Sequence, residues 1–103
     1  MKVNDFNLTA IQKNLMRLIN QIYKLLPQRE EEKDWKTPLS TIIEELLGMI
    51  DLLNQEKLFS LLCKLQGLNH LEQKEDFPLY RRIIFECLTL LNEIKGEIEN
   101  ERT

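Results

Sequence analysis

Residues 8–26 read LTAIQKNLMRLINQIYKLL and place apolar side chains at intervals of three and four. The stepped positions form one seam: Leu8, Ile11, Leu15, Leu18, Ile22 and Leu25. Because an α-helix turns once about every 3.6 residues, this spacing brings all six onto one side of a helix. Pro27 has no amide hydrogen with which to continue the helix. The sequence therefore predicts a first helix over residues 8–26 that buries one face.

A second helix signal follows the charged residues 28–36. The Thr37 hydroxyl can accept hydrogen bonds from free amides of a first turn, and the fixed φ of Pro38 suits the first helical position. From there apolar residues recur every three or four positions as far as Leu53. We expect a second helix over residues 38–53 and a solvated connector over residues 28–36.

Two more helices are expected in the second half of the chain. Asn54 is a good capping residue, and Gly67 is a typical stop, so a third helix is predicted over residues 55–66. A fourth helix is predicted over residues 78–98, and its seam repeats the same spacing: Phe77, Tyr80, Ile84, Cys87, Leu91, Ile94 and Ile98. A second connector is expected over residues 68–76, and the polar end suggests a frayed tail over residues 97–103.

These elements predict an all-α protein, a small four-helix bundle in one domain over residues 1–103. A chain of 103 residues, 43% hydrophobic and 30% charged, is long enough for one core and too short for two. No alternating strand pattern competes with the helices. A weak echo of residues 42–47 in residues 83–88 leaves a helical-repeat fragment as the less favoured alternative.

Cysteine usage and the N-terminal residues bear on location. The chain starts without an apolar leader, and no apolar window approaches the length of a membrane span. Two cysteines without a secretory signal are typical of free thiols in a reducing compartment, so we expect a cytoplasmic protein. Helical spacing places Cys87 on the buried seam and Cys63 on the far side of its helix.

Few residues are suited to catalysis or metal binding, so we expect no enzyme and no cofactor. His70 is the only histidine, and it lies in a connector, where an ordinary exposed imidazole is expected. The acids Glu44, Glu45 and Asp51 suggest one unfavoured alternative, a magnesium-dependent nucleotide hydrolase of helical type. Such a site needs carboxylates from more than one helix, and no other helix offers a matching inward pair.

A second alternative is a small helical subunit of a nucleoprotein complex. Lys13, Arg17 and Lys24 form a basic stripe opposite the apolar seam of the first helix, which suits contact with phosphate. The stripe is short, and residues 30–60 carry eight acids against three lysines, which repel a polyanion. A solvated face is therefore favoured over nucleic-acid binding.

The first and fourth helices carry more apolar surface than one buried face requires. A second row on the first helix consists of Met16, Ile19, Tyr23 and Leu26. On the fourth helix, an aromatic residue stands on the polar side beside two arginines: Phe85 with Arg81 and Arg82. Aromatic and arginine side chains are enriched at binding hot spots. These seven residues are the predicted partner-binding set; the alternative for Phe85 is a ring covered by the charged connector. Trp35 is expected to fold back onto the second helix.

The sequence as a whole predicts a non-catalytic module for protein–protein interaction, assembly or regulation. We expect it to be oligomeric, as a homodimer joined through the first and fourth helices. Its other protein partners cannot be named from these residues.

Overall fold

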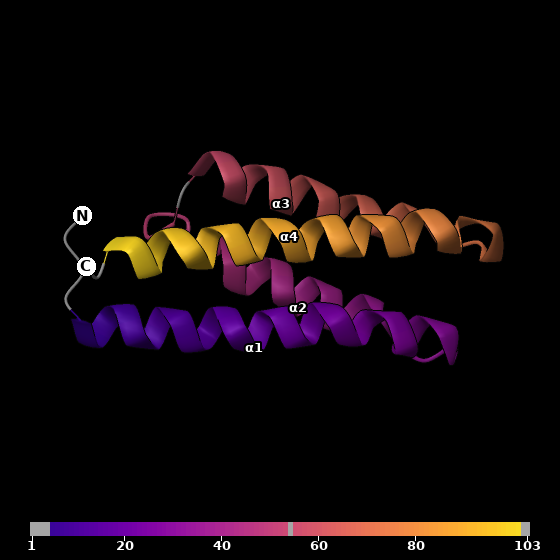
Figure 1. The fold of residues 1–103 in the computed structure, drawn as a ribbon. Coiled ribbons are helices and arrows are strands. Elements are labelled where there is room, and N and C mark those ends of the chain that lie inside the picture. The colour runs from indigo at the N-terminus through magenta and orange to yellow at the C-terminus, as the bar shows by residue number, and fades with distance from the viewer. Residues whose placement is uncertain (1–4, 54, 102–103) are drawn as a thin grey trace.

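The structure is a computed structural model that describes residues 5–53 and 55–101. In this part of the chain it has four α-helices: α1 (Asp5–Glu30), α2 (Lys36–Leu47), α3 (Gln55–Gly67) and α4 (Phe77–Glu101). Consecutive helices run in opposite directions along an elongated body of 45 × 22 × 19 Å (Figure 1). The fold is the expected small all-α four-helix bundle, and the described residues contain no strand.

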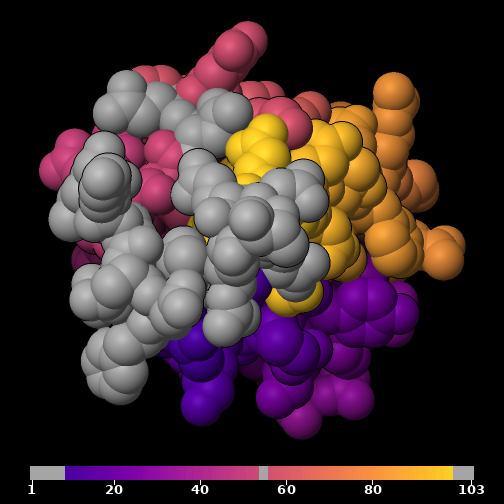
Figure 2. All heavy atoms as spheres, turned by 60° about the vertical axis from the view of Figure 1, so that its left-hand side comes forward, coloured from indigo at the N-terminus to yellow at the C-terminus, as the bar shows by residue number. Residues whose placement is uncertain are grey.

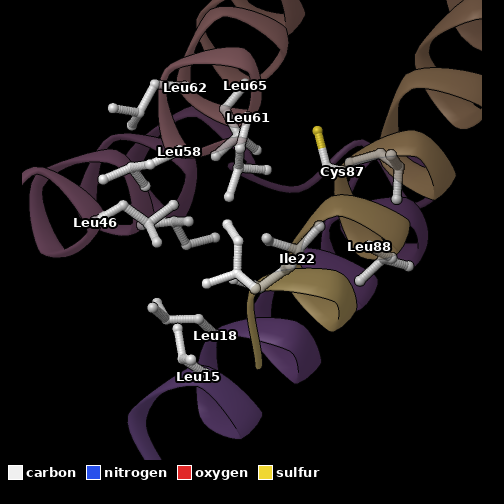
Figure 3. Close-up of a cluster of buried hydrophobic side chains, with 14 of the residues drawn as sticks. Leu15, Leu18, Ile22, Leu46, Leu58, Leu61, Leu62, Leu65, Cys87 and Leu88 are labelled. Carbon is white, nitrogen blue, oxygen red and sulfur yellow. The ribbon is translucent and has the colours of Figure 1, made fainter. Parts of the chain in front are cut away.

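The core lies along the axis of the bundle and is built from the predicted seams. Leu15, Leu18 and Ile22 of α1 point toward leucines of α2 and α3, and Cys87 and Leu88 approach from α4 (Figure 3). Most of these side chains have no exposed surface, and each buried leucine contributes about 1.5–3 kcal/mol relative to an exposed one. The core residues of α1 confirm the register that the three–four spacing predicted.

The first helix is longer at both ends than the predicted 8–26, because α1 begins at Asp5 and continues through Pro27 to Glu30. Pro27 removes one amide donor from the helix, a change that costs about 3 kcal/mol in a helix interior. It is exposed and stands one turn from the end, so few helical bonds remain beyond it. The extra turn carries Arg29 to the end of the bundle.

The end of α1 has the hydrogen bonds of a Schellman motif. The Glu32 amide donates to the Arg29 carbonyl at 3.1 Å, and the Lys33 amide donates to the Gln28 carbonyl at 2.8 Å. Glu32 has a φ of 57°, a left-handed conformation that glycine usually supplies. The connector is therefore shorter than the expected 28–36, and it turns sharply at Glu32.

The second helix starts earlier and ends earlier than the predicted 38–53. The Asp34 carboxylate accepts hydrogen bonds of 3.1 Å from the Lys36 and Thr37 amides, so Asp34, and not Thr37, satisfies the first free donors. The pKa of Asp34 is lowered most by a hydrogen bond from the Thr37 hydroxyl, and the bonds from the two amides lower it further. Pro38 then occupies the third helical position, where no amide donor is needed.

After Gly48, tight turns replace the last part of the expected second helix. The amides of Met49 and Ile50 donate to carbonyls three residues back. Leu53 is buried all the same, and Met49, Ile50 and Leu52 pack against the core. The apolar spacing over residues 48–53 therefore correctly predicted that the apolar side chains there pack into or against the core, but the prediction that these residues form a helix was wrong.

The remaining boundaries lie close to the predictions. α3 includes Gly67, and the second connector holds two short 3₁₀ turns, η1 (Leu68–His70) and η2 (Lys74–Asp76). The expected tail over residues 97–103 is helical as far as Glu101, and Ile98 is buried in the core. Asn54 and residues 102–103 lie outside the described residues. No helix in the described ranges is long and apolar enough to span a membrane.

Candidate functional site

Two of the four edges between neighbouring helices are closed by ion pairs. At the α1–α2 edge, both guanidinium nitrogens of Arg17 bond the Glu45 carboxylate, at 2.9 and 3.3 Å. At the α3–α4 edge, Lys57 pairs with Glu97 at 2.8 Å and Lys64 pairs with Glu86 at 3.0 Å. These edges present polar and charged groups to water.

The α1–α4 edge is different, because it presents aromatic side chains. Tyr23 of α1 is 56% exposed and Phe85 of α4 is 41% exposed. Their rings meet edge to face across the two helices, with centroids 6.4 Å apart and planes inclined by 80°. The Arg81 guanidinium lies 5.6 Å from the centre of the Phe85 ring, within the range of a cation–π contact.

Met16, also exposed, lies two turns before Tyr23 on the same side of α1. Ile19 is half-buried between them and packs against the core. We call these residues the α1/α4 face: Met16, Ile19, Tyr23, Arg81 and Phe85. In the space-filling view, the surfaces of α1 (indigo to purple) and α4 (orange to yellow) adjoin along one side of the molecule (Figure 2).

Two residues of the predicted partner-binding set lie elsewhere. Leu26 is buried in the core and contributes almost no surface to this edge. Arg82 turns away from Phe85, and its Nε lies 3.8 Å from Glu86 on the α3 side of α4. The other five predicted residues come together as the α1/α4 face.

The opposite edge, between α2 and α3, also presents apolar side chains, and sequence reasoning missed it. Leu47 is 45% exposed and Phe59 is 49% exposed. Two residues along a helix correspond to about 200°, so Leu47 points away from Glu45 and its α1 partner, and Phe59 points away from Lys57 and its α4 partner. Both side chains therefore lie on the α2–α3 side. The sequence did contain one indication of this edge: Phe59 does not belong to the row of buried leucines on its helix.

At one end of the bundle, Arg29 is enclosed by aromatic rings from two other segments. Its guanidinium carbon lies 4.6 Å from the Tyr80 ring, 5.4 Å from Phe77 and 5.8 Å from Trp35. The same guanidinium donates to the Leu71 carbonyl, and to the Gln73 carbonyl at 2.8 Å. We call this group the Arg29 clamp. It ties the end of α1 to both connectors and to the start of α4.

Trp35, which was expected to fold back onto the second helix, packs against the core and belongs to the Arg29 clamp. Its ring meets Tyr80 of α4 edge to face at a centroid distance of 5.2 Å. Tyr80 is completely buried, and burial raises the pKa of its hydroxyl while the nearby Arg29 cation partly opposes that rise. A hollow of about 550 Å³ is lined by three residues of the clamp, Arg29, Trp35 and Phe77, and by further basic and acidic residues. Its mixed charge does not select an anion over a cation.

The residues of the two alternative functions are not gathered into sites. Lys13 and Lys24 are exposed, but Arg17 between them is bound to Glu45, which interrupts the basic stripe. Glu44 and Asp51 are exposed, whereas Glu45 faces Arg17. Across the residues that the structure describes, no three His, Cys, Asp or Glu side chains lie close enough to hold a metal ion.

The thiols lie as the sequence predicted. Cys63 is exposed and Cys87 is fully buried on the α4 seam. Burial raises the pKa of the Cys87 thiol to about 12.

Comparison with protein-family models, curated proteins and solved structures finds no match to the chain.

Proposed function

We propose that this chain is a non-catalytic protein–protein interaction module that docks partners through the α1/α4 face. The observation that supports this most strongly is the half-exposed Tyr23–Phe85 pair, since neither ring is part of the buried core. Aromatic rings flanked by arginine are the groups that contribute most to binding at protein interfaces. A second copy of the chain is among the partners that we propose.

The rigidity of the site supports the same function. Both rings stand on long helices whose other sides are fixed in the core, and Ile19, one turn before Tyr23, packs against that core. A surface that is already ordered loses little conformational entropy when a partner binds. Tyrosine and phenylalanine have only two side-chain torsions, which keeps the remaining entropy loss small.

Site-specific photo-cross-linking tests the proposed function. Phe85 is replaced by p-benzoylphenylalanine in the full-length chain, expressed in its own host. The control carries the same group at Leu79, which is equally exposed on α4 and lies two turns before Glu86 on the α3 side. We expect adducts from position 85 that Tyr23→Glu abolishes. Absence of adducts at position 85, or equal adducts at both positions, would contradict the proposal.

A further inference from the structure

Charge is distributed unequally between the two apolar edges. Between Phe6 and Arg29, α1 carries no acidic residue, and in the first four turns of α4 the only acid is Glu86, which is bound to Lys64. Lys13, on the outer surface of α1 between the helical positions of Met16 and Arg17, and Arg81 beside Phe85 make no ion pair with another described residue. The α1/α4 face is therefore apolar at its centre and cationic around it.

The α2–α3 edge, on the opposite side of the bundle, carries charge of the opposite sign. We call the apolar side chains there the α2/α3 face: Ile43, Leu47 and Phe59. Three exposed acids on α2, in the turn after it and in the first turn of α3 form no ion pair with another described residue: Glu44, Asp51 and Glu56. Lys36, the nearest base on α2, is already paired with Glu72. The α2/α3 face is therefore apolar at its centre and anionic around it.

From this complementarity we propose that the occupant of the α1/α4 face is the α2/α3 face of a second copy of this chain. This inference rests on the proposed function and adds the identity of a partner. Two copies that met through the same α1/α4 face would bring cations against cations, which disfavours a symmetric dimer. Pairing of unlike faces instead aligns Arg81 and Lys13 of one copy with acids of the next.

The positions of the two faces determine what such pairing builds. They lie on opposite sides of the bundle, since α1 contacts α2 and α4 while α3 contacts α2 and α4. A head-to-tail contact leaves one free face at each end, so assembly continues until it closes as a ring or extends as a filament. The two polar edges, closed by the ion pairs of Arg17, Lys57 and Lys64, remain on the outside of either assembly.

Complementation between two variants tests the inference. Phe85→Glu blocks the α1/α4 face and Phe59→Lys blocks the α2/α3 face, each at a half-exposed position where we expect the fold to be retained. Circular dichroism and the thermal midpoint verify the fold of both variants. By sedimentation from about 1 to about 200 µM, we expect wild type to exceed the dimer mass and each variant alone to remain a monomer. An equimolar mixture of the variants should form a 1:1 complex that stops at twice the monomer mass and weakens in about 0.5 M NaCl.

Other outcomes separate this inference from the proposed function. If Phe59→Lys alone dimerises while Phe85→Glu alone does not, the copies meet through like faces; the head-to-tail inference is then wrong and the proposed function stands. If both variants assemble as wild type does, neither face is used between copies. A wild type that remains monomeric at about 200 µM overturns the inference, and the cross-linking at position 85 still decides the proposed function.

Discussion

The guanidinium carbon of Arg29, in the last turn of α1, lies 4.6 Å from the centre of the buried Tyr80 ring, in the first turn of α4. The two residues are distant in sequence, and the contact joins the ends of the two longest helices. Because the same guanidinium also holds two carbonyls of the second connector, one side chain fixes three segments.

Arg29→Ala should lower the free energy of unfolding by about 2–3 kcal/mol, because a desolvated cation–π contact and two charge-assisted hydrogen bonds are lost. Arg29→Lys should recover only part of this, since an ammonium lacks the planar fork that reaches both carbonyls. Urea unfolding measures both changes. Arg82→Ala is the matched control, because the Arg82 side chain is 76% exposed and should change stability by less than about 0.5 kcal/mol. Equal losses for Arg29→Ala and Arg82→Ala would contradict the role of the clamp.

Glu32→Gly should stabilise the protein by about 1 kcal/mol. Glu32 holds a φ of 57°, which costs a residue with a Cβ about 1–2 kcal/mol and costs glycine almost nothing. The same substitution at Glu30, the last residue of α1, should instead destabilise by about 1 kcal/mol, because that position is helical. Chemical denaturation of the pair provides the measurement. Destabilisation by both substitutions would exclude a left-handed residue at position 32.

Tyr80→Phe should leave stability at pH 7 unchanged or raise it by up to about 1 kcal/mol, since the buried hydroxyl has no hydrogen-bond partner among the described residues. The pKa of Tyr80 is raised in the folded protein. The stability that arises from this raised pKa is therefore fully present below about pH 10, the pKa of tyrosine in the unfolded chain, and it is lost as the pH rises above that value.

Thermal unfolding of wild type and Tyr80→Phe at pH 7 and near pH 10.5 checks this sign. Wild type should lose more stability than the variant between the two values, while other alkaline groups, including Cys87, cancel in the comparison. A larger alkaline loss in the variant would mean that Tyr80 does not have a raised pKa.

Iodoacetamide should label Cys63 in the native protein and leave Cys87 unmodified until the protein unfolds. Cys63 is exposed, whereas Cys87 is fully buried with its pKa raised to about 12, so its thiolate is scarce and inaccessible. Peptide mass spectrometry after timed labelling gives both rates. Labelling of Cys87 as fast as Cys63 under native conditions would show that the register of α4 is wrong.

Sequence spacing was sufficient to predict the helices and their buried seams, because periodic burial leaves a local signal. It was a poor guide to where helices end. Pro27 is tolerated near the exposed end of α1, and Asp34 performs the capping that Thr37 was expected to perform. At 48–53 the apolar residues reach the core from turns, which the spacing alone does not distinguish from a helix.

Residues of the candidate site could be predicted where the spacing along one helix exposes them. They could not be predicted where contacts with other segments decide their position. Tyr23 and Phe85 each stood out from the seam of their own helix, so both were found. The burial of Leu26 depends on how the helices pack, which its own helix does not show. The contact of Arg82 with Glu86 is an i, i+4 pair within α4, which the helical spacing alone could have indicated. The Arg29 clamp joins two connectors and two helix ends, and no local pattern indicates which aromatic rings will surround one arginine.

Sedimentation equilibrium of wild type, Tyr23→Glu and Leu79→Glu tests the central claim most directly, namely that the α1/α4 face binds protein and that a second copy is one of its partners. Across micromolar concentrations we predict that wild type and Leu79→Glu sediment above the monomer mass of 12.3 kDa, and that Tyr23→Glu sediments as a monomer. Leu79 is as exposed as the face residues but lies off the face, so it controls for simple loss of surface hydrophobicity. Wild type at 12.3 kDa throughout would contradict a second copy as partner, and Tyr23→Glu as heavy as wild type would contradict binding through the α1/α4 face.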